Sequence, residues 1–295
     1  MSDVQIVDAH IHAWSPDIER FPLAPGFESS DLWLPSFTPD DHDMYTSLFG
    51  EPVAGINLVQ MTWYGLDHRY ILDLIESDPH RFTGTGIVPA VSDVSLGSPE
   101  RIMRDLARNG IRAFRIRGRA AQPQWGQTDQ WLDQDGYERM FAAAAEDDLV
   151  LSFLVGPTDL PEIGRMCSRF PETAVIIDHV GGVRVQEGAI DATQLQALLD
   201  LAAHPRVFVK LGPIPGLGDA EAPFSGSVPL LRPVIDTFGA DRCMWETDSG
   251  GPLLFADPPR DLLAAVDVIR RAEFLTDHDK RLILGGTARQ LLWAC

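Results

Sequence analysis

The chain has 295 residues, of which 45% are hydrophobic and 23% charged, a composition typical of an ordinary globular protein. Its formal net charge of -19 disfavours sequence-independent binding to nucleic acid or to anionic lipid, because both need clustered cations. The three cysteines are odd in number and lack metal-site spacing, and neither a leader-like start nor a membrane-length apolar run is visible. We therefore expect reduced thiols and a cytoplasmic protein.

Eight short apolar runs predict buried strands along the chain. They cover residues 5–13, 53–61, 82–90, 111–118, 149–156, 174–182, 207–215 and 243–251. Amphipathic segments that predict helices lie between them, at 69–77, 98–110, 137–148, 161–170, 194–204 and 231–240. This alternation predicts an α/β fold, a (β/α)8 TIM barrel formed by residues 1–295 as a single domain.

Two of the predicted connections are unusually long. Ser15 to about Asp41 is rich in proline and aromatic residues, and Pro213 to Val228 is rich in glycine and proline. They follow the first and seventh predicted strands, which places both at the C-terminal mouth of the barrel, where barrel enzymes build their active sites. The aromatic residues Trp14, Trp63 and Tyr64 follow the first two strands and either flank a substrate ring or pack at the rim.

Four side chains that can bind a metal or move a proton fall at the C-terminal ends of predicted strands. His10 and His12 end the first strand, His179 the sixth and Asp248 the eighth. Residues two apart on a strand share a face, so both imidazoles of the pair can point at one place in the barrel mouth. A single histidine in a strand is more often structural, and it is the shared position of the four that indicates a site. The remaining histidines, His42, His68, His80, His204 and His278, have loop-like or helical settings and are expected to be structural.

Cationic side chains share the inward faces of the same predicted strands. Arg115 and Arg117 lie two apart on the fourth strand, and Lys210 lies late in the seventh. Such donors suit a substrate carboxylate, while an ion-pair layer at the barrel waist is the alternative for the arginines. Glu246 lies on the same strand face as Asp248, one layer deeper in the barrel. We expect it to pair with Lys210 or Arg115, the alternative being an outward salt bridge on the helix side.

Five segments together resemble the amidohydrolase-2 family of the amidohydrolase superfamily. They are "VDAHIHAW", "RFPETAVIIDHVGG", "HPRVFVKLG", "FGADRCMWETDSGGP" and "LILGGTARQLL", and they span essentially the whole chain in the family's order. The arrangement is most similar to the lactonase branch, which includes 2-pyrone-4,6-dicarboxylate lactonase and fuconolactonase. The resemblance implies a distorted (β/α)8 barrel whose site is built around His10, His12, His179 and Asp248, with arginines of the mouth binding an acidic substrate.

The chain departs from the family pattern at several places. Members with two metals carry a bridging lysine or glutamate on the fourth strand and a histidine on the fifth, and "RAFRIRG" and "LVLSFLVG" offer neither. Glu246 stands where the family usually has glycine, and Ser249 where it often has tryptophan. These departures argue against a two-metal site and point to an unusual pocket.

The resulting functional hypothesis is a hydrolase that opens a carboxylated or sugar-acid lactone by attack of water. Asp248 serves as general base, and His10, His12 and His179 polarise the carbonyl, either directly or through one divalent metal held by the same four residues. Zinc is the first choice of metal, and a metal-free mechanism is equally open. The alternatives are a metal-dependent decarboxylase or a lactone isomerase of the same superfamily, and a non-catalytic sugar-acid binding protein. The expected partner is the small acidic substrate, with self-association left open.

Overall fold

The structure is a computed structural model that describes residues 5–89, 95, 97–121, 128–219, 221–253 and 255–293. In these ranges its central sheet holds eight parallel strands, in which each strand pairs with the next along the chain. The strands are β1 (Val7–Ile11), β2 (Gly55–Val59), β3 (Phe82–Ile87), β4 (Ile111–Arg117), β5 (Val150–Leu154), β6 (Ala174–Ile177), β9 (Val207–Lys210) and β10 (Cys243–Met244). The predicted barrel of eight strands is confirmed, although each strand is shorter than its apolar run.

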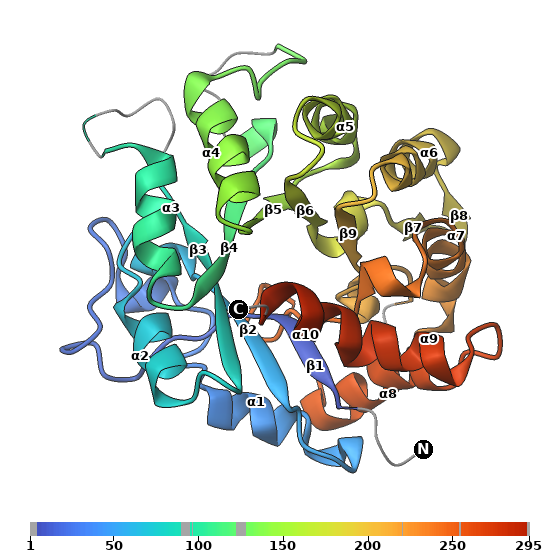
Figure 1. The fold of residues 1–295 in the computed structure, drawn as a ribbon. Coiled ribbons are helices and arrows are strands. Elements are labelled where there is room, and N and C mark those ends of the chain that lie inside the picture. The colour runs from blue at the N-terminus through green and yellow to red at the C-terminus, as the bar shows by residue number, and fades with distance from the viewer. Residues whose placement is uncertain are drawn as a thin grey trace.

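Helices surround the sheet on its outer side (Figure 1). They are α1 (Pro39–Tyr45), α2 (Arg69–Ser77), α3 (Pro99–Ala107), α4 (Asp135–Glu146), α5 (Leu160–Arg169), α6 (Ala192–Asp200), α7 (Val228–Phe238), α8 (Pro258–Arg270), α9 (Asp277–Arg281) and α10 (Thr287–Leu292). A small hairpin of β7 (Val185–Gln186) and β8 (Ala189–Ile190) lies in the connection after β6. No helix in the described ranges is long and apolar enough to cross a bilayer.

The barrel closes where the first strand meets the segment after β10. Ala9 N donates to Trp245 O over 3.2 Å, Asp248 N to His10 O over 3.0 Å, and His12 N to Ser249 O over 2.8 Å. The buried carboxylate of Asp8 ties the same two segments together, because it accepts from the backbone N–H and the hydroxyl of Thr247. The closure therefore brings residues from the two ends of the chain to one place.

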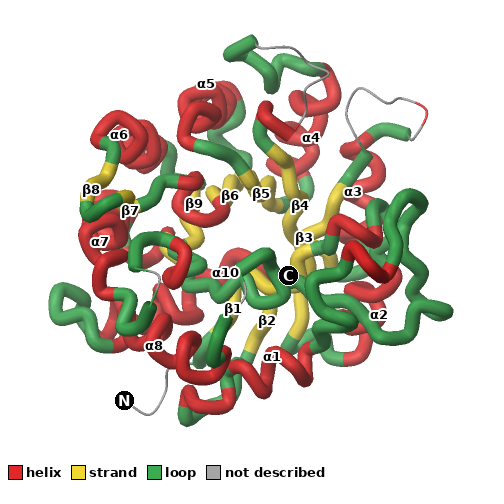
Figure 2. Tube along the Cα trace, turned by 180° about the vertical axis from the view of Figure 1, so that it is seen from behind, coloured by secondary structure: helices red, strands yellow, loops and turns green. Residues whose placement is uncertain are grey.

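The interior of the barrel is filled by side chains near its N-terminal end. A buried cluster there combines small and medium residues of the strands with two residues of α10, and comprises Val7, Ala9, Ala113, Val150, Ala174, Ile176, Met244, Ala288 and Leu292. Figure 1 shows α10 lying across this end, and Figure 2 shows the molecule from the opposite side, with the loops that follow the strands. The polar residues that follow the strands are thereby left to the other end, the mouth.

Candidate active site

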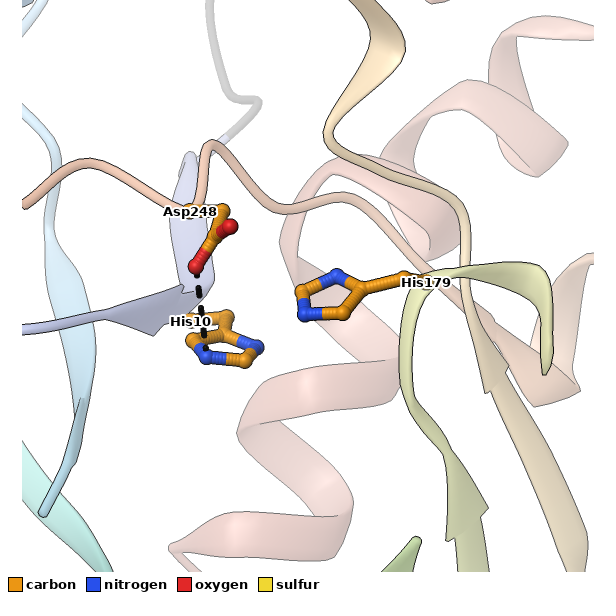
Figure 3. Close-up of side chains that lie close together, drawn as sticks. All are labelled: His10, His179 and Asp248. Atoms are coloured by element: carbon orange, nitrogen blue, oxygen red, sulfur yellow. Dashed lines mark ion pairs between the residues drawn. The ribbon is translucent and has the colours of Figure 1, made fainter. Parts of the chain in front are cut away.

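Four polar side chains come together at the mouth of the barrel. His10 and His12, on and just after β1, are 0% and 7% exposed, and their Nε2 atoms lie 3.3 Å apart. His179 follows β6 and Asp248 follows β10. Figure 3 shows His10, His179 and Asp248 converging from three parts of the chain. The structure thus brings together the four residues that the sequence singled out.

Both His179 and Asp248 have left-handed backbone conformations, with φ of +52° and +54°. Residues other than glycine rarely adopt this region, and the strain is held in place by the surrounding fold. His179 lies in the turn after β6, and Asp248 lies in the segment after β10. These strained turns therefore direct the two side chains toward the histidine pair, which the alternation of a strand alone would not do.

Three acceptor atoms form a compact triangle in the site. Asp248 Oδ1 lies 3.5 Å from His10 Nε2 and 3.5 Å from His12 Nε2, and the two nitrogens are 3.3 Å apart. Asp248 Oδ1 is buried and has no hydrogen-bond donor among the described residues. Three such atoms face one another only if a cation, a proton or a water lies between them.

The partners of the two imidazoles assign their ring protons. His12 Nδ1 lies 2.9 Å from the carbonyl oxygen of Val59, which can only accept, so this nitrogen carries the proton and Nε2 the lone pair. Arg115 Nη2, which can only donate, lies 2.9 Å from His10 Nε2, so this nitrogen also carries a lone pair. Both histidines consequently present Nε2 lone pairs toward Asp248.

Both histidines of the pair are neutral. Burial, together with the nearby charge of Arg115, lowers the pKa of His12 to about 3. Burial and the neighbouring Lys210 ammonium hold the pKa of His10 well below its usual range. Neutral imidazoles are the form that binds a metal ion or accepts a hydrogen bond from a substrate or water.

In contrast to the histidine pair, His179 and Asp248 both have raised pKa values. Burial lowers the pKa of His179, but the carboxylate of Glu246 outweighs burial and raises this pKa to about 9. Burial raises the pKa of Asp248 to about 6, against the opposing charge of His179. At neutral pH the site therefore holds an imidazolium that can donate a proton and a carboxylate that is basic enough to accept one.

Glu246 is only 1% exposed, so its side chain points into the barrel and the alternative of an outward salt bridge is wrong. The expected pairing with Lys210 or Arg115 is also wrong. Glu246 Oε1 instead lies 2.8 Å from His179 Nδ1, and Oε2 lies 2.9 Å from His10 Nδ1. The reason is that both cations already have a closer carboxylate partner.

That partner is Asp178, which the sequence analysis missed. Its buried carboxylate lies 2.9 Å from Lys210 Nζ and 3.1 Å from Arg115 Nη2, and it accepts from the Ser152 hydroxyl. Burial would raise the pKa of Asp178, but the two cations outweigh burial and hold it below its usual value. The need for such a carboxylate could have been inferred from the sequence, because two cations inside a barrel require a countercharge.

The remaining predicted substrate-binding residues have different settings. Arg117 is half-buried at the end of β4, where its Nη2 donates to Thr62 Oγ1 over 2.5 Å. The indole of Trp14 donates to Leu34 O over 3.1 Å and packs edge-on against Trp63. The Tyr64 hydroxyl accepts from Ser15 N over 3.0 Å. Trp14, Trp63 and Tyr64 are each under 5% exposed, which fits rim packing rather than contact with a substrate ring.

The triangle of acceptor atoms fits one divalent metal ion. Zinc bonds to nitrogen and oxygen are about 2.0–2.1 Å long, so two ligands of a tetrahedral ion lie about 3.3 Å apart. The three edges of 3.3, 3.5 and 3.5 Å match this spacing. His10, His179 and Asp248 also offer three ligand atoms that all lie within 4.8 Å of one another. Arg115 on β4 and Ser152 on β5 both contact Asp178.

A (β/α)8 barrel with a histidine pair on its first strand and an aspartate after its last defines a class of barrel hydrolases. The sequence profile of the family described as Amidohydrolase matches residues 7–292. The chain belongs to the amidohydrolase family and is a hydrolase, which confirms the resemblance seen in the sequence.

Named relatives and a solved structure agree with this assignment. The chain is 28% identical to an L-fucono-1,5-lactonase from Burkholderia ambifaria, in a match that covers 82% of this chain and 79% of the relative. It is 24% identical to a 4-sulfomuconolactone hydrolase from Hydrogenophaga intermedia, with 82% and 73% covered. The fold is similar to that of a zinc-bound amidohydrolase from Burkholderia multivorans, with a TM-score of 0.73 and 19% identity over 97% of this chain and 98% of that one.

Proposed function

We propose that this protein hydrolyses the ring ester of a lactone that carries an acidic group. The observation that carries the proposal is Asp248, a buried carboxylate whose Oδ1 has no donor among the residues that the structure describes and lies 3.5 Å from two neutral imidazoles. With a pKa of about 6 it is ionised at neutral pH and still basic enough to take a proton from water. The names of the two relatives, a lactonase and a lactone hydrolase, support the same reaction class.

In the proposed reaction Asp248 accepts a proton as water attacks the lactone carbonyl carbon. The carbonyl oxygen gains negative charge, and the His179 imidazolium is the hydrogen-bond donor available to it. The ring carbon–oxygen bond then breaks, and the departing alkoxide takes the proton that Asp248 accepted from water and becomes a hydroxyl. The product is an open hydroxy acid, and the enzyme returns to its starting protonation.

One divalent metal ion would be held by His10 Nε2, His12 Nε2 and Asp248 Oδ1, with zinc the first candidate because a zinc-bound structure shares the fold. Such an ion supplies a Lewis acid that lowers the pKa of bound water and polarises a carbonyl. Arg115 also contacts His10 Nε2, so its guanidinium and a metal compete for one lone pair. The ring of His12 is held by its contact with the carbonyl oxygen of Val59, and the ring of His179 is held by Glu246.

Recognition of the acidic group is proposed for Arg117. Arg115 and Lys210 both contact Asp178, so their charges are largely balanced within the protein. Arg117 lies at the same end of β4, and burial lowers its pKa, as expected for a cation in a poorly solvated place. A substrate carboxylate or sulfonate would accept charge-assisted hydrogen bonds from the Arg117 guanidinium and so replace the hydration that the guanidinium loses on burial.

The test is a panel of sugar-acid lactones, carboxylated unsaturated lactones and their neutral analogues, followed with a pH indicator because each turnover releases an acid. We expect hydrolysis of at least one anionic lactone by the wild-type protein and a loss of about 10²–10⁴-fold in kcat for Asp248→Asn. Full kcat in a folded Asp248→Asn variant would contradict the role of this residue. Release of carbon dioxide would indicate a decarboxylase, a product of unchanged mass an isomerase, and saturable binding without turnover a binding protein.

A further inference from the structure

Glu246 lies between two histidines and contacts the same atom of each. Its Oε1 is 2.8 Å from Nδ1 of His179, and its Oε2 is 2.9 Å from Nδ1 of His10. The two rings stack, with centroids 4.7 Å apart and planes inclined by 24°. A single buried carboxylate therefore contacts both rings from the side opposite their Nε2 atoms.

The neighbours of His10 decide which of its nitrogens bears the proton. Arg115 Nη2 is an obligate donor 2.9 Å from Nε2, so the lone pair must be there and the proton on Nδ1. The nearest carboxylate to Nδ1 is Glu246 Oε2, an ion-pair contact of 2.9 Å that falls outside hydrogen-bond geometry, and Lys210 Nζ, a donor, lies 3.4 Å from the same nitrogen. Arg115 and Glu246 thus favour the same tautomer from opposite edges of the ring.

The strand end beside Glu246 is shaped to admit its side chain. A Cβ on Gly212 would come within 2.5 Å of Glu246 Cγ and 2.6 Å of its carbonyl oxygen. Only a residue without a side chain leaves this space. The glycine after β9 and the glutamate after β10 are therefore matched in shape, as expected of a built position rather than an accidental contact.

From these contacts we propose that Glu246 is a positioning residue that holds the ring of His179 by a hydrogen bond from its Nδ1–H and the ring of His10 by an ion-pair contact at its Nδ1. It leaves the Nε2 atom of each ring for the site, so the two histidines act with fixed orientation. A glycine at this position would hold neither ring. The placement of protons stands on the geometry alone, and only the effect on turnover rests on the proposed lactonase function.

The direct test is long-range ¹H–¹⁵N NMR of metal-free protein labelled with ¹⁵N-histidine, which reports the protonation of each ring nitrogen. In the wild type we expect protonated Nδ1 on both His10 and His179. In Glu246→Gln the Nδ1 signal of His179 should change, because a carboxamide is a weaker acceptor and adds a competing NH₂ donor, whereas Arg115 still fixes the proton of His10 on Nδ1. His12, whose Nδ1 contacts Val59 O, is the internal control and should not change.

The matched control is Asp159→Asn, another buried carboxylate on the loop after β5, since Asp159 pairs with Arg119 and contacts neither histidine. Its histidine spectra should match those of the wild type. An unprotonated Nδ1 on His10 or His179 in the wild type would overturn the proposal without any variant. Unchanged histidine spectra in a folded Glu246→Gln protein would do the same.

Kinetic measurements on two Glu246 variants distinguish the effect of the carboxylate's position from the effect of its charge. Glu246→Asp keeps the negative charge but is one methylene shorter and can reach only one of the two rings. We expect both Glu246→Asp and Glu246→Gln to lower kcat about 10–100-fold, the usual effect of losing a residue that orients a site histidine, with much smaller changes in KM. Wild-type kcat in Glu246→Asp would show that charge alone matters and would overturn the positioning role. If no lactone is turned over, the lactonase proposal fails while the NMR result still decides this one.

Discussion

Asp178 and Lys210 form an ion pair of 2.9 Å in which neither side chain reaches solvent. Arg115 adds a second cation 3.1 Å from the same carboxylate. A buried carboxylate between two cations is costly to remove, because the cations remain without a countercharge. The pair therefore supports the floor of the site rather than the binding of a substrate.

We predict that Asp178→Asn lowers the free energy of unfolding by about 3–5 kcal/mol, the range for breaking a buried ion pair. Urea denaturation at neutral pH measures this. Asp105→Asn, which removes an exposed partner of Arg108, is the control and should cost less than about 1 kcal/mol. An effect of Asp178→Asn as small as that of the control would mean that the two cations find other partners.

The raised pKa of Asp248 predicts that its removal stabilises the metal-free protein. The folded pKa of about 6 lies above the ordinary value of 3.8, so the folded state binds the proton more tightly, and ionisation costs stability as the pH rises from about 4 to 6. In chelated protein Asp248→Asn should gain roughly 2–3 kcal/mol above pH 6, and less as the pH falls toward 4. A gain that does not vary with pH would show that the carboxylate is not the cause.

The pH dependence of kcat/KM should be bell-shaped. Activity should rise as the pH passes about 6, where Asp248 ionises, and fall as it passes about 9, where the His179 imidazolium loses its proton. In Asp248→Asn the kcat/KM of any residual activity should no longer decrease as the pH falls below about 6. A profile that is flat between pH 5 and 7 (about one unit on either side of this pKa) would exclude Asp248 as the titrating base.

Metal content gives an independent check of the three-atom triangle. We expect purified protein to hold about one divalent ion per chain by elemental analysis, and His12→Ala to lose it. His278→Ala, which removes an exposed histidine, is the control and should keep the ion. Full lactonase activity after exhaustive chelation, with no metal detected, would instead assign carbonyl polarisation to the protein's own donors.

Replacement of Arg117 should affect substrate binding more than turnover. Arg117→Met is expected to raise KM for an anionic lactone about 10-fold or more with little change in kcat, since a charge-assisted contact holds substrate and transition state alike. Arg112→Met, at the other end of the same strand, should leave KM unchanged. Equal hydrolysis of a lactone and its neutral analogue by the wild type would contradict the role of Arg117.

The barrel and the meeting of His10, His12, His179 and Asp248 could be predicted because both depend on local patterns. Apolar runs give the strands, and strand ends of a parallel barrel share one mouth. The charge pairing could not be predicted in the same way. Strand alternation assigns alternate residues to opposite faces, yet Asp178 and His179 are neighbours that both face the site, since the left-handed φ of His179 breaks the alternation.

The error over Glu246 has a related cause. The sequence shows that inward cations need a carboxylate, but not which carboxylate is nearer. Asp178, directly after β6, lies beside Lys210 at the end of β9 because these strands are neighbours in the sheet, whereas Glu246 contacts the imidazoles. The packing of Trp14 and Tyr64 also depends on hydrogen bonds to residues of the long first loop, which no strand pattern specifies.

The seam between the first strand and the segment after β10 sets the order in which the protein can become functional. Asp8 is bonded to Thr247, 239 positions later, so these contacts must wait until most of the chain has left the ribosome. Contacts between such distant segments carry a large loop-closure cost and are expected to form late. The nascent chain therefore carries its two N-terminal histidines through most of synthesis without their aspartate, and closure of the barrel and arrival of the base are one event.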